Sequence, residues 1–203
     1  PYNKYCFCED GAQALAGCAP IAIAQIMAYH EWPVMIDGRL LDWDAIKCYP
    51  YVTETNQTAD NLSYFINRIG VVAGAVYGVS ATSTPTANVT NAFEYFGYTS
   101  DGLRAFNEHD AKLSVDNDRP LYSRGASGAG GHGWVVDGYK YERKTINYYN
   151  YYLYVDNPFE SVDIYRIYFH CNWGWNGQSD GYYLSDAFLS YKREVRMVAN
   201  IDV

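Results

Sequence analysis

Hydrophobic positions in the first half of the chain repeat at helical spacing. Residues Cys18 to His30 are apolar on nearly every side, with Pro20 in the first turn, which predicts a buried helix beginning at or beside Cys18. Trp32-Pro33 ends that segment. Apolar stripes also predict helices at about 61–69 and 87–96, each followed by a glycine.

The pattern changes after Pro120. Short runs of β-branched and aromatic residues, separated by turn residues, predict strands at 121–122, 132–136, 148–155, 165–169, 181–184 and 195–201. Helices followed by strands predict an α+β fold with an antiparallel sheet or barrel. We expect one domain over residues 1–203, with a helical lobe at about 1–118 and a sheet lobe at about 119–203.

Composition mainly excludes classes of partner. The formal net charge of -8 leaves no basic stripe to neutralise phosphates, so we expect no nucleic acid or anionic membrane as partner. The longest apolar stretch, about 19–28, is far shorter than the roughly 20 residues that span a bilayer, so no membrane insertion is expected. The chain opens at Pro1 without an initiator Met or a leader, so we expect any signal or pro-segment to lie outside it.

The cysteines are Cys6, Cys8, Cys18, Cys48 and Cys171. An odd number leaves at least one without an intrachain partner, as a working thiol requires. One residue separates Cys6 from Cys8, whereas zinc knuckles place two to four between their ligands, so no zinc site is expected. Pairing of Cys6 or Cys8 with Cys48 or Cys171 in an oxidising compartment stays open.

Cys18 stands where a thiol becomes a strong nucleophile. Oriented N–H groups at the start of a helix lower a thiol pKa, and a neighbouring imidazole lowers it further. Gly17 just before it permits close approach of a substrate backbone. The alternative interpretation is a buried cysteine that packs in the helical core.

A candidate base for that thiol is His132, in the segment GGHGWVVDG at 130–138. Gly131 and Gly133 leave its imidazole accessible at the start of an apolar strand. The alternative interpretation is a structural histidine.

A third segment, HCNWGWNGQSDGY at 170–182, holds an adjacent Asn172 and Trp173. An asparagine oxygen can hold a histidine tautomer while a tryptophan screens that hydrogen bond from water. The alternative interpretation is a glycine-rich turn with packed tryptophans.

These segments occur in a characteristic order: AGC (16–18) leading into AQIMAYH (24–30), then GHGWVVDG (131–138), then NWGW (172–175). Together they resemble the streptopain family of papain-like cysteine peptidases. The opening PYNKY and the central stretch 77–98 resemble that family too, so the resemblance covers nearly the whole chain.

The resemblance implies a two-lobed papain-like fold and a secreted or cell-surface bacterial endopeptidase made as a zymogen, with an N-terminal pro-segment as intramolecular inhibitor. It assigns the catalytic pair to Cys18 and His132, and the family's Asn-Trp pair to Asn172 and Trp173. It also implies a protein or peptide substrate with a hydrophobic P2 side chain.

Some positions depart from the family pattern. Papain-like enzymes often place an oxyanion-hole Gln six residues before the nucleophile, but position 12 is Ala and Gln13 lies five before. Gln13 is therefore a candidate donor beside the Cys18 backbone N–H, with a surface loop residue as the alternative. The Tyr-rich stretch 139–166 is longer than the family pattern, and we predict a hairpin near the cleft.

We expect peptide-bond hydrolysis through a thioester, with Cys18 as nucleophile, His132 as general acid and base, and no metal or cofactor. Amide transfer by the same two residues stays open. So does a catalytically silent adhesion module that uses the Tyr-rich surface 148–168.

The substrate cleft is expected beside the segment 79–87, a Ser/Thr/Ala run typical of an exposed loop. Small hydroxylated side chains can lie beside a peptide backbone without blocking it. We therefore expect Thr82 and Ser83 to bind substrate, together with Gly131 and Gly133.

Overall fold

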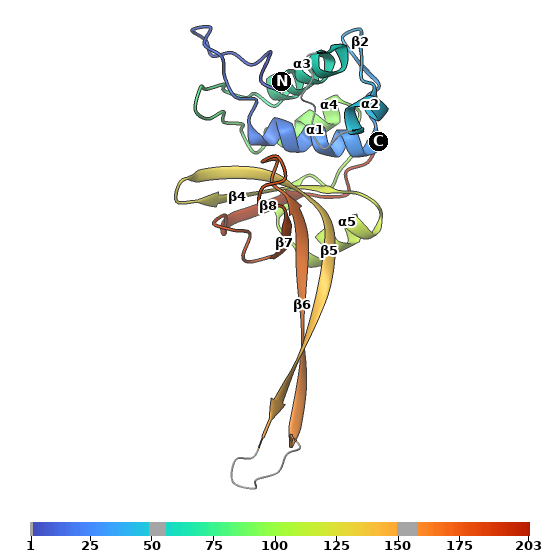
Figure 1. Ribbon diagram of the computed structural model, residues 1–203, viewed down its shortest axis with the longest axis vertical. Helices are drawn as coiled ribbons and strands as arrows, with labels where there is room; N and C mark the ends of the chain where they lie inside the picture. Colours follow the sequence, from blue (N-terminus) through green and yellow to red (C-terminus); the bar gives the residue numbers. More distant parts are fainter. Residues whose placement is uncertain (1, 49–55, 150–157) are drawn as a thin grey trace.

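The computed structural model describes residues 2–48, 56–149 and 158–203, which fold into a helical lobe stacked on a sheet lobe (Figure 1). Its helices are α1 (Cys18–His30), α2 (Trp43–Lys47), α3 (Gln57–Val72), α4 (Asn88–Tyr95) and α5 (Glu108–Asp116). Its strands are β1 (Met35–Ile36), β2 (Arg39–Leu40), β3 (Leu103–Ala105), β4 (Leu121–Ser127), β5 (Gly130–Tyr148), β6 (Glu160–Asn172), β7 (Gly181–Leu184) and β8 (Arg193–Val198). The predicted α+β class is confirmed.

Helix α1 lies between the two lobes and has the predicted bounds (Figure 1). Its side chains are buried on several sides because α3 covers one flank and the sheet covers another. The helix ends at Glu31, which adopts the left-handed conformation and donates its backbone N–H to the Met27 carbonyl. Helix α3 is longer than predicted, since the Asn56 side chain caps it by accepting from the Ala59 N–H.

The large sheet is antiparallel with strand order β3-β8-β4-β5-β6-β7. Side chains alternate across it. Tyr122, Val135 and Val198 face the core of the helical lobe, whereas their neighbours Leu121 and Trp134 face the core of the sheet lobe. Both faces of the central strands are therefore buried, and α1 rests on one of them.

The sheet lobe begins earlier than residue 119. Strand β3 pairs with β8, and Ala111 of α5 packs in the core of the sheet lobe. Both elements come from the segment that the sequence analysis assigned to the helical lobe. Helix α5 was not predicted because it buries only Ala111 and Ser114, too few positions for an apolar stripe.

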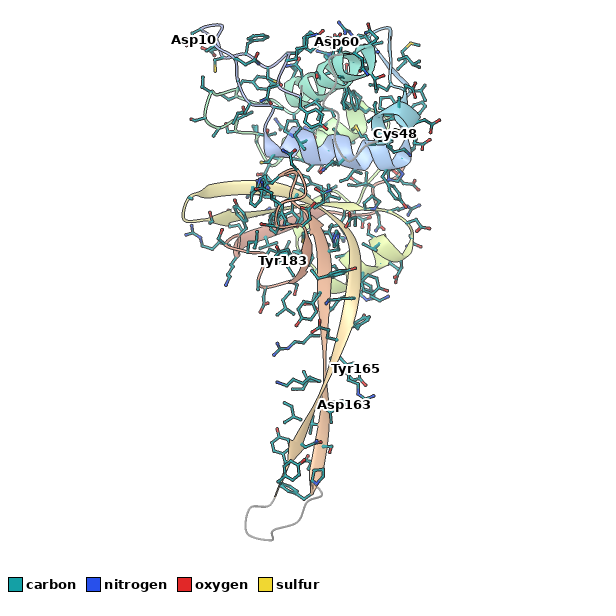
Figure 2. All side chains as sticks on the ribbon, in the orientation of Figure 1. Asp10, Cys48, Asp60, Asp163, Tyr165 and Tyr183 are labelled. Carbon is teal, nitrogen blue, oxygen red and sulfur yellow. The ribbon has the colours of Figure 1, made fainter. Side chains whose placement is uncertain are left out.

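Strands β5 and β6 extend far beyond the rest of the sheet as a two-stranded hairpin (Figure 1). Asp163 and Tyr165 lie on this arm, well away from both lobes (Figure 2). The prediction of a hairpin was right, but its place near the cleft was wrong, because the strands run on from the end of the sheet remote from α1. The strand predicted at 148–155 lies, after its first two residues, outside the described part of the chain.

Candidate active site

Cys18 is the first residue of α1, and Gly17 is its N-cap. No side chain caps this helix start, so its first N–H groups remain available to a ligand. Gly17 has φ 93°, and a Cβ there would lie 3.0 Å from Cγ2 of Thr82. Backbone conformation and close packing therefore both require glycine before the thiol.

An open cleft of about 590 Å³ runs between the lobes at this helix start. The helical lobe contributes residues 15–18 and 80–82, and the sheet lobe contributes His132 and residues 173–176. Cys18, in α1, and His132, in β5, are far apart in sequence but line the same cavity. Thr82 and Gly131, predicted to bind substrate, also line it.

Thr82 holds the cleft wall in place through its hydroxyl. That oxygen donates to the Leu15 carbonyl at 2.6 Å and accepts from the Gly78 N–H at 3.2 Å. Ser83 is not part of the lining, and its backbone pairs with Val76. Of the two predicted loop residues, only Thr82 therefore reaches the cleft.

The Cys18 sulfur accepts a hydrogen bond from the Gly133 N–H, with the nitrogen 3.4 Å from Sγ. A Cβ on Gly133 would lie 2.5 Å from the hydroxyl of Tyr122, which is buried beneath it. Burial, and secondarily the charge of Cys18, raise the pKa of that phenol. Gly133 thus contacts the thiol rather than lining the cleft, and its N–H donates to the sulfur.

The imidazole of His132 is buried to 8% exposure among aromatic rings. Trp175 and Tyr191 lie closest, with ring centroids 4.7 and 5.3 Å away. Burial lowers the pKa of His132, and a hydrogen bond to the Trp173 carbonyl partly opposes that shift. Nε2 lies 2.9 Å from this carbonyl oxygen, which can only accept, so Nε2 carries the proton and Nδ1 of the neutral ring is free to act as base.

Asn172 does not contact the imidazole. Its Oδ1 accepts instead from Nε2 of Gln25 and from the Gly174 N–H, each at 3.0 Å. The predicted hydrogen bond between His132 and Asn172 is therefore absent, and the imidazole bonds to the backbone carbonyl of Trp173 instead. The chain turns directly after this carbonyl, at Gly174, which has a left-handed conformation (φ 72°).

Trp173 is buried to 1% exposure and lies nearly parallel to His132, with ring centroids 5.8 Å apart. Its backbone N–H donates to Asp180, which fixes the other side of the turn. The indole of Trp173 is thus stacked on the imidazole, and its backbone carbonyl makes the hydrogen bond to the ring.

Gln13 is not among the residues that line the cleft. Its Nε2 donates to the carbonyls of Asn3 and Cys6, at 2.5 and 2.7 Å. Because these two hydrogen bonds tie the Gln13 amide to the N-terminal loop, the geometry does not support the predicted role of Gln13 as an oxyanion donor. The start of α1 leaves the Cys18 N–H as the donor.

Sequence reasoning missed Gln25, Trp175 and Tyr191. Two of these residues could have been identified from the sequence: Gln25 interrupts the apolar run of the first helix, and Trp175 belongs to the NWGW segment. Nothing in the pattern around Tyr191 marks it, because the loop before β8 brings it to His132.

None of the other four cysteines lies at the start of a described helix. All five thiols are free, and burial raises the pKa of Cys6 and of Cys171. In the described ranges, no group of three or more His, Cys, Asp or Glu side chains could hold a metal ion. Nor does any described helix have the length and apolar character needed to cross a membrane.

Comparison with known proteins gives a consistent result. The model of the peptidase C10 family matches residues 1–183. Streptopain of Streptococcus pyogenes is 26% identical over 211 residues, covering 87% of this chain and 47% of its own length. The thiol protease/hemagglutinin PrtT of Porphyromonas gingivalis is 22% identical over 216 residues, covering 91% of this chain and 22% of its own length. The chain thus spans about half the length, or less, of these curated relatives.

Among solved structures, active wild-type interpain A cysteine protease of Prevotella intermedia matches with a TM-score of 0.68 and 21% identity. The match covers 98% of this chain and 88% of that one. A prointerpain A fragment from the same organism matches with a TM-score of 0.66 and 21% identity, covering 98% of this chain and 67% of that one. The predicted papain-like fold is confirmed.

Proposed function

We propose that this chain, which belongs to the peptidase C10 family of cysteine peptidases, hydrolyses peptide bonds through a thioester formed on Cys18. The observation that carries the proposal is that Cys18, at an uncapped helix start, and His132 line the same cleft. The Gly133 N–H, 3.4 Å from Sγ, adds a donor that favours the thiolate.

In the first step, Nδ1 of His132 takes the proton of the Cys18 thiol, and the sulfur attacks the substrate carbonyl. The backbone N–H of Cys18, at the uncapped start of α1, donates to the developing oxyanion. The imidazolium then gives its proton to the leaving amine. The carbon–nitrogen bond breaks and a thioester remains.

In the second step, His132 takes a proton from water, and the hydroxide attacks the thioester. Collapse of the tetrahedral intermediate releases the acid and returns the proton to sulfur. The Trp173 carbonyl accepts from Nε2 throughout, so it holds the tautomer and stabilises the imidazolium of both steps.

For the whole protein we propose one catalytic domain over residues 1–203, protein or peptide substrates with a hydrophobic P2 side chain, and a secreted or cell-surface location in a bacterium. Relatives named as a streptopain and as a thiol protease support this class of substrate. The prointerpain A match supports an N-terminal pro-segment, and we propose that this segment acts as an intramolecular inhibitor.

Labelling with an epoxysuccinyl inhibitor tests the proposal. Cys18 should be alkylated, and the reaction should be lost in His132→Ala. Cys48, an exposed free thiol of the helical lobe (Figure 2), is the internal control and should stay unlabelled at the same dose. If Cys18 is not labelled, the result would support a catalytically silent adhesion module instead. The comparisons with known proteins do not favour that alternative.

Amide transfer by the same residues is separated by adding a primary amine to the peptide assay. Hydrolysis predicts that the acid remains the main product. If most acyl groups passed to the amine at millimolar concentration, the enzyme would be a transferase, and water would not be the natural acceptor.

A further inference from the structure

Gln25 is a polar residue on the side of α1 that contacts Asn172. It follows Cys18 by about two helical turns, so the two side chains project from the same face of the helix. Ile21 lies between them and approaches the 173–176 turn, since a Cβ on Gly174 would lie 3.3 Å from its Cγ2. This face of α1 is therefore in contact with the turn that contacts His132.

The amide of Gln25 begins a chain of hydrogen bonds that ends at the imidazole. Gln25 Nε2 donates to Asn172 Oδ1, which also accepts the Gly174 N–H. That N–H belongs to the same peptide unit as the Trp173 carbonyl, which accepts from His132. A planar peptide unit is thus held at its N–H end by Asn172 and at its C=O end by the imidazole.

We propose that Gln25 is a positioning residue of the active site, which acts through Asn172 to fix the peptide unit whose carbonyl orients His132. This inference rests on the proposed peptidase function. Because Gln25 and Cys18 share one helix, the same element sets the place of the nucleophile and the direction of the base.

The other end of the Gln25 amide supports this role. Its Oε1 is buried and has no hydrogen-bond partner among the described residues. An unpaired buried acceptor destabilises a fold, so the amide is a poor choice for packing alone. Methionine has a similar length and no such acceptor, and would fill the same space. Methionine, however, has no N–H group to donate to Oδ1 of Asn172.

The test compares Gln25→Met with a matched control, Thr90→Val, which removes another buried side-chain oxygen without a partner, on α4. In Gln25→Met we expect kcat per titratable thiol to fall about tenfold, with KM within about twofold of wild type. Thr90→Val should keep the wild-type kcat. A purely structural role predicts the reverse, a changed thermal midpoint with unchanged kcat per active thiol.

A second readout does not depend on turnover. The Trp173 carbonyl supports the charged form of His132, so a loosened carbonyl should lower the pKa of the imidazole further. Tyr191, stacked on the ring, and Cys18, in the same cleft, are unchanged in the variant. NMR titration of His132, assigned with His132→Ala, should show this shift in Gln25→Met and not in Thr90→Val. An unshifted titration would overturn the inference even if the enzyme hydrolyses peptides normally.

The double variant with Asn172→Ala completes the test. Because Gln25 acts through Asn172, adding Gln25→Met to Asn172→Ala should slow the enzyme no further. Multiplying effects would show that Gln25 acts by another route and overturn the inference. If wild type itself neither hydrolyses peptides nor is labelled at Cys18, the proposed function fails, while the titration still decides the positioning role.

Discussion

Strands β5 and β6 build two regions that have the same pairing but different surroundings. At the near end, β4 and β7 flank the pair, α1 covers one face, and the strands carry His132 and Asn172. At the far end, residues 141–148 and 160–167 pair only with each other among the described residues. Tyr141, Tyr165 and Phe159 are more than half exposed there.

The difference between the two ends shows that the tendency of residues to form strands does not by itself predict where an active site lies. Both ends carry aromatic and β-branched residues, but only the near end has neighbours that fix side-chain and backbone directions. An isolated two-stranded ribbon gains little stability from its own contacts in water. We therefore expect the chemistry to depend on the near end and to be independent of the far end.

The largest expected effect is at the thiol. Cys18→Ala should lower kcat/KM by roughly 10⁵-fold or more, because an oxyanion donor cannot replace a covalent nucleophile. His132→Ala should be nearly as severe, and the double variant should be no slower than the worse single one. Active-site titration and peptide hydrolysis measure this. Appreciable turnover by folded Cys18→Ala would contradict the mechanism.

Asn172→Ala should slow kcat about tenfold to a few hundredfold, because it frees the Trp173 carbonyl, whose hydrogen bond to the charged imidazole contributes on the order of 1.5 to 3 kcal/mol. The physical reason is that the Gly174 N–H loses its acceptor and the Trp173 carbonyl is no longer held. We would measure kcat per titratable thiol together with the thermal midpoint. A lowered midpoint with normal kcat would make Asn172 a turn residue alone.

Acid should destabilise the helical lobe through His30, at the end of α1. Burial is the main cause that lowers its pKa, and its Nε2 is buried without a partner among the described residues. A histidine in the unfolded chain titrates near pH 6.5. As the pH falls below that value, the unfolded state therefore binds a proton at His30 more readily than the native state does. Stability is thus retained above about pH 6.5 and falls toward lower pH, by at most about 1.4 kcal/mol per pH unit for this group.

His30→Phe should reduce this acid slope. Urea unfolding at pH 7 and pH 5 would give the difference in unfolding free energy for both proteins. His132, whose pKa burial also lowers, keeps part of the slope in the variant. Equal slopes in the two proteins would remove His30 from the explanation.

The smallest expected effect comes from shortening the arm. Tyr141 and Ile167 are paired across the hairpin, so an Asn-Gly turn can join them in place of residues 142–166. We expect kcat/KM for a short peptide to stay within about twofold of wild type, because no described contact links the removed residues to the cleft lining. A clear loss would show that the arm supports the site.

The sequence was sufficient where burial alone decides structure. Helix α1 has its predicted bounds because it is apolar on nearly every side, and β7 has its predicted bounds between clear turns. The acceptor of His132 was not predictable in the same way. Whether the side chain of Asn172 or the carbonyl of Trp173 faces the ring depends on a bond from Gln25, which is 147 residues away.

The position of the arm depended on long-range pairing as well. Residues 139–166 were recognised as a hairpin, but only the register, with Val135 opposite Asn172, shows that the strands reach the cleft at their inner ends. Gln13 was a wrong candidate for a related reason. It is the glutamine nearest to the expected position, one residue away from it, but its amide donates to the carbonyls of Asn3 and Cys6.

The acceptor of His132 is a main-chain atom, and this changes what a genetic experiment can see. Every amino acid at position 173 supplies a carbonyl, so a mutational scan of Trp173 reports on the indole and not on the acceptor. The acceptor can be altered only through the residues that aim it or by semisynthesis of the backbone. A scan would therefore rank Asn172 and Gln25 as functional and miss the atom through which both act.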